Sequence, residues 1–326
     1  MKKQELKTIT REQAVKMLAK KGIILPECNI LENVPAIAEQ KKDYISMIEF
    51  KFICSVNGIE NEIVPDNSNT KKAEYSRMGI IYKGSKILSP IGYIAELLKA
   101  GNDKTGKAVF TFSLLPGTML YEIIINGIIE LVKGTCCCNC PGCYAKTGRY
   151  NCDNVLQSMG INTYLVNNYP EFVQAAINAQ LASAIRGEVR IHAAGDFNTN
   201  NPEQYANMWL EIAKKNNTFR FWTYTKVTRF ETLFDGLKNA NIVKSIIPSI
   251  GFNFGHCDYI INAYYTLKAM GKSVYICKCG IDRNQHCEKC GVCATYEYVL
   301  FLEHSTDYKA ELDPLYDKFV DLVNNQ

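Results

Sequence analysis

The chain of 326 residues contains no apolar run long enough to cross a membrane. The nearest candidate, residues 121–132, is too short and is interrupted by Glu122, Asn126 and Glu130. The first residues are basic, but no apolar stretch follows them, so the sequence does not predict a signal peptide. We therefore expect a cytoplasmic protein that makes no use of a membrane.

The sequence also lacks an excess of charge of one sign. It has 37 basic and 33 acidic residues, which are interspersed and leave a net charge of +4. A polyanionic partner usually requires a basic stripe, so nucleic acid is not indicated. The locally basic residues 1–22 are interpreted as a solvated helix face. No fixed-period repeat or low-complexity tract is present, which argues against a solenoid or a disordered linker.

Histidine is scarce, with four residues, whereas cysteine is abundant, with 14. A chain of this length can bury a core without disulfides, which are typical of small secreted domains. Soft thiolate ligands favour zinc or iron–sulfur and disfavour calcium or magnesium. We therefore expect the cysteines to bind metal in a reducing compartment.

The first cysteine set is Cys136, Cys140 and Cys143, with C-x3-C-x2-C spacing. One short loop can wrap a metal centre in this way while supplying three thiolates. A four-iron cluster held by three thiolates keeps one iron free for an outside ligand. The alternative is a structural zinc site with Cys137 or Cys138 as the fourth ligand.

The second set has a C-x2-C-x2-C core and an upstream partner. Its candidate ligands are Cys287, Cys290, Cys293 and either Cys277 or Cys279. The core resembles half of a ferredoxin site, whose fourth thiolate comes from elsewhere in the chain. If the metal is zinc, His286 becomes a further candidate ligand.

The middle of the chain alternates strand-like and helical segments in steps of roughly 25 to 30 residues. The strand-like runs are residues 123–132, 189–193, 219–224, 242–247 and 273–276. Helices are expected after Pro170, Pro202 and Thr228, and over residues 260–267. This order predicts stacked βαβ units with a parallel sheet and a full or partial (β/α) barrel.

Three segments follow from this pattern. Residues 1–105 are expected to form an α+β extension of unknown role, with short strands and a helix over residues 91–99. Residues 106–276 are expected to form the partial barrel with the first iron–sulfur site. Residues 277–326 are expected to form a cysteine-rich segment with an auxiliary cluster and C-terminal helices.

Loops that follow parallel strands converge on one face of a barrel. The first cysteine loop, Asp196 and Lys226 each follow a strand, so we expect them to share one mouth. Asp196 is a candidate functional carboxylate, with a turn cap as the alternative. His192 is either a proton donor or a core histidine, and Lys226 either binds an anion or is an exposed basic residue.

These motifs resemble two known groups. A C-x3-C-x2-C loop in a partial (β/α) barrel is similar to the radical S-adenosylmethionine superfamily. A nearer resemblance, over about residues 106–300, is to the phage gene product 88 group of uncharacterised proteins. The segments that carry it are residues 140–145, 190–197, 222–226 and 286–293.

The radical-enzyme resemblance implies a [4Fe–4S] cluster on the first loop, a second auxiliary cluster, and S-adenosylmethionine bound to the open iron. Residues 194–196 would correspond to the superfamily's Gly-Gly-Glu segment, with one glycine replaced and a shorter acid. The resemblance implies cofactor contacts at Gly195 and Asp196, with Tyr144 and Asn253 as further candidates. The candidate catalytic residues are Asp196, His192 and Lys226. It also implies a reductant such as a flavodoxin or ferredoxin. The alternative is a non-catalytic iron–sulfur or zinc-stabilised phage or mobile-element protein that binds nucleic acid or another protein.

Overall fold

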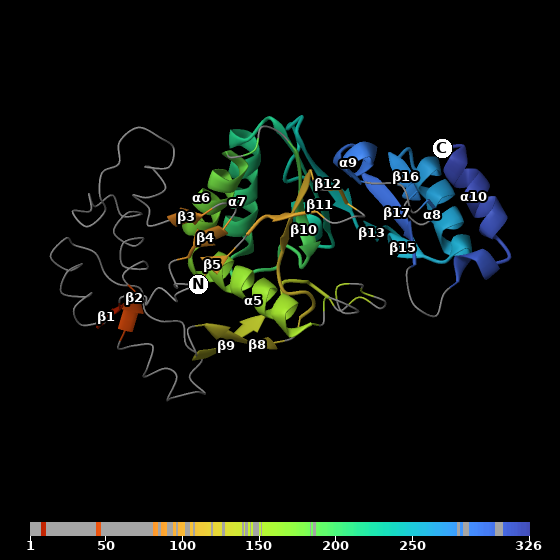
Figure 1. Cartoon of the computed structure of the whole chain (residues 1–326). Coiled ribbons are helices and arrows are strands. Elements are labelled where there is room, and N and C mark those ends of the chain that lie inside the picture. Colours follow the sequence, from red (N-terminus) through yellow and green to blue (C-terminus); the bar gives the residue numbers. More distant parts are fainter. Residues whose placement is uncertain are drawn as a thin grey trace. The chain divides into compact units, whose positions relative to one another are not determined.

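The structure is a computed structural model of the whole chain (Figure 1). It describes residues 8–10, 44–46, 81–83, 86–89, 94–95, 97–101, 105–106, 108–118, 120–125, 128–138, 140, 143, 145, 150, 152–182, 184, 187–278, 281–282, 287–303 and 309–326. The chain divides into two compact units. The first contains residues 1–97, 120–133 and 160–183, and the second contains residues 98–119, 134–159 and 184–326. The second unit therefore draws on all three segments expected from the sequence.

The described part of the first unit consists of short antiparallel strands and helices. Strands β1 (Thr8–Thr10) and β2 (Tyr44–Ser46) pair, as do β3 (Ile81–Lys83), β4 (Lys86–Leu88) and β5 (Ile94–Ala95). Helix α6 (Pro170–Ala182) begins at the predicted proline, and α5 (Asp153–Asn168), which the sequence analysis did not predict, spans the division between the units.

The helix expected over residues 91–99 is wrong. Strand β5 lies within that range, and β6 (Lys99–Ala100) begins at its last residue. Leu97 and Leu98 are both buried at 1% exposure although they are adjacent in sequence. Strand β5 pairs with β4, and β6 pairs with β7, so pairing with neighbouring strands overrides the local helical spacing.

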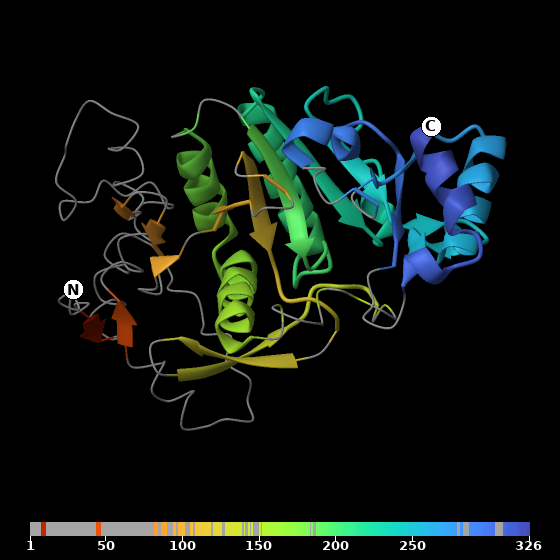
Figure 2. The same cartoon turned by 45° about the vertical axis from the view of Figure 1, so that its right-hand side comes forward.

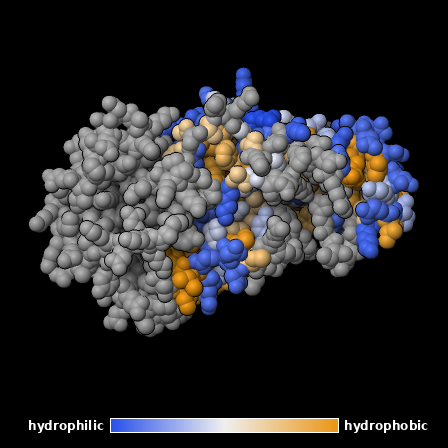
Figure 3. Space-filling model, viewed as in Figure 1, coloured by the Kyte–Doolittle hydropathy of each residue, from blue (hydrophilic) through white to orange (hydrophobic). Residues whose placement is uncertain are grey.

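The predicted strand over residues 123–132 is also wrong, because this stretch is a β-hairpin. Strands β8 (Leu120–Ile125) and β9 (Ile128–Lys133) pair antiparallel, with Ile125 opposite Ile128. The sequence between them is Asn126-Gly127, the dipeptide that favours a two-residue hairpin turn. Three apolar side chains of the hairpin are exposed: Leu120, Ile124 and Ile129. Figure 3 shows an orange area in the region where Figure 1 draws this hairpin.

The second unit is built on a five-stranded sheet with the order β12-β11-β10-β7-β6. Strands β7 (Val109–Ser113), β10 (Gly187–Ala194), β11 (Phe219–Thr225) and β12 (Ala240–Lys244) are parallel, and β6 is an antiparallel edge strand. The predicted parallel sheet is thus confirmed. Its first parallel strand is β7, which precedes the hairpin.

Helix α7 (Pro202–Lys215) covers one face of this sheet, as Figure 2 shows. The side chain of Asn201 accepts a hydrogen bond from the Gln204 backbone N–H, which caps the first turn. Trp209 is fully buried and meets the ring of Phe112 from β7 edge-on, with centroids 5.4 Å apart. This packing fixes the sheet whose carboxyl ends carry the candidate site.

The predicted helix after Thr228 is wrong. Only a 3-10 turn, η3 (Thr228–Phe230), forms there, and turns follow it to Gly236. The expected capping partner Glu231 instead faces Lys244 of β12, with the charged atoms 3.8 Å apart. The apolar residues that suggested a helix include Phe234, which is buried from a turn. Apolar spacing over so few residues did not distinguish turns from a helix.

A second parallel sheet follows, with the order β15-β17-β16. Its strands are β15 (Phe254–Gly255), β16 (Val274–Ile276) and β17 (Tyr298–Leu302). Helices α8 (Cys257–Ala269) and α10 (Tyr316–Asn324) pack together on it around a buried apolar core (Figure 2). A short hairpin of β13 (Ile246–Ile247) and β14 (Gly251–Phe252) connects the two sheets in sequence.

The connection from β16 to β17 carries the second cysteine set. It contains the short helix α9 (Cys287–Cys290) and the 3-10 turn η5 (Val292–Ala294). No sheet among the described strands closes into a barrel. The partial barrel of radical S-adenosylmethionine type stays a prediction.

Candidate functional site: two cysteine-rich centres

The first cysteine loop starts at the carboxyl ends of β7 and β10. The backbone N–H of Thr135 donates to the Leu115 carbonyl at 2.9 Å, and its hydroxyl accepts from the Asp196 N–H at 3.0 Å. Gly195 has φ +83°, and a Cβ there would lie 2.6 Å from the Thr135 hydroxyl and 2.7 Å from Leu114 Cβ. Only glycine permits this close approach without strain, so Gly195 holds the loop against the sheet.

Asp196 is buried and organises the turn beside this loop. Its Oδ1 accepts from the Phe197 N–H at 2.8 Å and from the Thr225 hydroxyl at 2.7 Å, and its Oδ2 accepts from the Lys226 N–H at 2.9 Å. Burial raises the pKa of this carboxyl, although the three donors and the Lys226 charge act in the opposite direction. These contacts join the ends of β10 and β11 and favour the turn-cap interpretation of Asp196.

Lys226 lies among the first cysteines. Its carbonyl oxygen is 3.6 Å from Cys137 Sγ, and its ammonium is 5.9 Å from the centre of the Phe252 ring. Burial lowers the pKa of Lys226, but nearby anionic groups, first Cys140 and then Asp196, raise it above its ordinary value overall. Lys226 therefore places a positive charge beside the cysteine loop, which suits a thiolate-bound centre.

The thiols of the first loop are close to one another. The Sγ atoms of Cys138 and Cys140 are 3.7 Å apart, and those of Cys137 and Cys138 are 3.9 Å apart. Two thiolates on one tetrahedral zinc lie at a similar separation of about 3.8 Å. Burial, followed by the Asp196 charge, raises the pKa of Cys136 to about 12. A bound metal would therefore have to displace the thiol proton.

His192 is a buried histidine with both ring nitrogens paired. Nδ1 lies 2.9 Å from the Thr223 hydroxyl, and Nε2 lies 2.9 Å from the Tyr205 hydroxyl. Its ring meets Phe197 edge-on at 4.7 Å. Burial, helped by the charge of Arg190, lowers the pKa of His192 to about 3. These contacts favour the core-histidine interpretation.

Asn253 and Tyr144 complete the residues predicted for this site. The Asn253 side chain donates to the Val299 carbonyl at 2.9 Å, and its backbone N–H donates to the Ser245 carbonyl at 3.1 Å. Asn253 thus ties the end of β12 to β17. Tyr144 lies outside the described residues.

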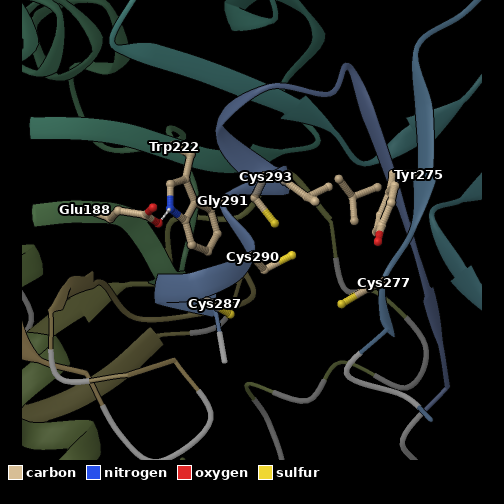
Figure 4. A pocket seen from close by; sticks show the side chains of 10 residues that line it. Glu188, Trp222, Tyr275, Cys277, Cys287, Cys290, Gly291 and Cys293 are labelled. Atoms are coloured by element: carbon tan, nitrogen blue, oxygen red, sulfur yellow. Dashed lines mark hydrogen bonds between the residues drawn. The ribbon is translucent and has the colours of Figure 1, made fainter. Parts of the chain in front are cut away.

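The second cysteine set surrounds one pocket, shown in Figure 4. Four cysteine side chains from β16's carboxyl end, α9 and η5 line it: Cys277, Cys287, Cys290 and Cys293. Trp222 and Glu188, from the main sheet, line its opposite side. Cys279 and His286, the other candidate ligands, lie outside the described residues.

Gly291 lets the cysteine turn approach the sheet. It has φ +64°, and a Cβ at this position would lie 2.9 Å from an Arg220 guanidinium nitrogen. Arg220 in turn forms an ion pair with Glu188, which also accepts a hydrogen bond from the Trp222 indole at 3.3 Å. The second pocket therefore rests on one face of β10 and β11, the face that carries residues 188, 220 and 222.

Tyr224, to which the sequence analysis gave no role, contacts the second cysteine set. The Tyr224 hydroxyl lies 2.7 Å from Cys293 Sγ. Burial raises the pKa of Cys293 to about 12. The available signal was the alternation along β11, because Arg220, Trp222 and Tyr224 lie on the face opposite the buried Phe221 and Thr223.

The end of strand β11 lies beside both cysteine-rich segments. The Tyr224 hydroxyl meets Cys293 of the second set, and the carbonyl of Lys226, the residue after the strand, meets Cys137 in the first cysteine loop. Two strand residues span only about 6.6 Å. The two segments are far apart in sequence but lie beside the same end of one strand.

The described part of the chain contains no group of side chains arranged to bind a single metal ion. No three of its histidine, cysteine, aspartate or glutamate side chains are grouped closely enough to hold one ion. The cluster and ligand assignments therefore stay predictions.

A family model described as gene product 88 matches residues 96–251, slightly less than half of the chain. This match supports the predicted resemblance to the phage protein group over those residues, which include the first cysteine loop and strands β7 to β12. The second cysteine set lies outside the match. No curated protein and no solved structure matches the chain.

The sequence analysis predicted no segment that crosses a membrane, and the helices of the structure bear on this prediction. Within the described ranges, no helix is both long and apolar enough to span a bilayer.

Proposed function

We propose that this chain is an iron–sulfur protein with one cluster in the second pocket and another on the first cysteine loop. The observation that carries the proposal is the convergence of Cys277, Cys287, Cys290 and Cys293 on one pocket. Four cysteine thiolates are the usual ligand set of a [4Fe–4S] cluster. They line one common space, which is what a cluster bound by four thiolates requires.

The first loop is the proposed catalytic centre, in an enzyme that resembles the radical S-adenosylmethionine group. Its three predicted ligands, Cys136, Cys140 and Cys143, would leave one iron open to S-adenosylmethionine. When bound, the cluster and this cofactor would supply one-electron cleavage of the sulfonium group. The chain itself contributes the Lys226 cation, which offsets thiolate charge, and the Asp196 turn, which holds the loop beside the strand ends.

The second cluster would pass electrons to the first. The end of strand β11 supports this proposal because Tyr224 contacts Cys293 and Lys226, the residue after the strand, contacts Cys137. The electrons would come from a small redox protein such as a flavodoxin or ferredoxin.

A specific observation favours the non-catalytic alternative at the first loop. The 3.7 Å separation of the Cys138 and Cys140 sulfurs fits a shared zinc ion, with Cys138 as the fourth ligand. In addition, Asp196 is already occupied by three donors and is 3% exposed. On this proposal the loop would stabilise a phage protein that binds another macromolecule.

Serine variants test the second pocket. The triple variant Cys287→Ser, Cys290→Ser, Cys293→Ser should lose about half of the iron of the anaerobically purified protein and keep the cluster of the first loop. The matched control is Cys152→Ser, because Cys152 is exposed and lies before α5, outside both cysteine sets. Unchanged iron content in the triple variant would remove the second cluster from the proposal.

The cofactor test addresses the first loop. Adding S-adenosylmethionine to the reduced protein should change the electron paramagnetic resonance signal of the first cluster, and dithionite should then yield 5′-deoxyadenosine. No spectral change at millimolar cofactor, with the cluster intact, would favour the structural alternative.

A further inference from the structure

Tyr224 occupies a fixed position behind the second pocket. Its ring meets Trp222 at 5.5 Å and Phe301 at 5.4 Å, both nearly edge-on. The guanidinium of Arg190 lies 5.4 Å from the centre of the same ring. Contacts with strands β10, β11 and β17 therefore leave the ring little freedom to turn away.

The Tyr224 hydroxyl points at a predicted metal ligand. Its oxygen is 2.7 Å from Cys293 Sγ, and either atom could be the donor while the cysteine is a thiol. A metal-bound thiolate has no proton, so in the loaded site the tyrosine must donate. A hydrogen bond to a ligand sulfur disperses its negative charge and stabilises the more negative, reduced form of a cluster.

We propose that Tyr224 is a positioning residue that orients Cys293 and raises the reduction potential of the cluster in the second pocket. This inference rests on the proposed iron–sulfur function. It assigns the tyrosine to regulation of that site, through one hydrogen bond from the rigid strand β11. A raised potential would let this cluster accept electrons from a weaker reductant.

The test compares the wild type with Tyr224→Phe and Tyr275→Phe. Tyr275 also lines the pocket, and Cys290 and Cys277 act on it electrostatically, but its side-chain hydrogen bond is with Gln326, which makes it a matched control. Iron content is measured first, and potentiometric titration of the second cluster follows, read by electron paramagnetic resonance. Tyr224→Phe should lower the reduction potential of the second cluster by up to about 59 mV, which is roughly a tenfold change in the equilibrium constant for one-electron reduction. Tyr275→Phe should leave this potential unchanged.

The outcomes separate this inference from the proposed function. A lower potential in Tyr224→Phe alone, or loss of the second cluster in that variant alone, supports the positioning role. Equal potentials in all three proteins with full iron would overturn it and leave the iron–sulfur assignment standing. A wild type without iron at the second pocket would overturn both.

Discussion

Acid should destabilise the main sheet through His192. The ring is 3% exposed and is held between the hydroxyls of Thr223 and Tyr205. Its folded-state pKa of about 3 lies below the unfolded value of 6.5. Because the folded state favours the neutral ring, this stability is fully present above pH 6.5. It is lost as the pH falls from 6.5 toward 3.

The size of the effect follows from the two pKa values. Between pH 7 and pH 5 the unfolded state takes up most of one proton, while the folded state takes up almost none. The resulting loss in the free energy of unfolding is about 2 kcal/mol. A histidine that served as a proton donor near neutral pH would need a pKa close to that range, and would produce a much smaller loss.

Urea unfolding at pH 7 and pH 5 measures this loss, with tryptophan fluorescence as the probe. Both tryptophans, Trp209 and Trp222, lie in the second unit, so the signal reports on the sheet that contains His192. The comparison protein is His192→Gln, which keeps one donor and one acceptor but does not titrate. Its free energy of unfolding should fall by about 2 kcal/mol less between the two pH values. An equal fall in both proteins would refute the reasoning.

Two further predictions concern the first cysteine loop. Gly195→Ala should lower the free energy of unfolding by more than Gly236→Ala does. Both glycines have positive φ, but an added Cβ would lie within 2.7 Å of other atoms at Gly195 and would meet open space at Gly236. The control should lose about 1 to 2 kcal/mol from backbone strain alone, and equal losses in thermal or urea unfolding would contradict the close approach. The triple variant Cys136→Ala, Cys140→Ala, Cys143→Ala should lose the first cluster and keep the second. The electron paramagnetic resonance signal of the second cluster should become narrower, because β11 brings the two sites together in the wild type. A spectrum of the wild type equal to the sum of the separate clusters would show that the sites do not interact.

The parallel sheet could be predicted from the sequence because its signals are local and agree with one another. Helix α7 begins at Pro202 with an Asn201 cap, and the flanking strands β10 and β11 carry apolar residues such as Val189, Ile191 and Phe221. The hairpin of β8 and β9 was missed because apolar residues flank Asn126-Gly127 directly on both sides, which resembles one long strand. The Asn126-Gly127 dipeptide was the stronger evidence.

The candidate site was predictable in its position but not in the roles of its side chains. The order of strands indicated that the first cysteine loop, Asp196 and Lys226 would meet at one edge, and their hydrogen bonds join them there. Whether a carboxylate is open to a ligand depends on burial and on donors from other strands, here including Thr225. The contact of Tyr224 with Cys293 spans 69 residues, so the alternation along β11 indicates the face on which Tyr224 lies but not the residue that it meets.

The most direct test of the central claim is metal analysis of the wild-type protein purified without oxygen. With a four-iron cluster at each site, the protein should be brown and contain roughly eight irons per chain. A colourless protein with stoichiometric zinc after anaerobic reconstitution would contradict the iron–sulfur proposal.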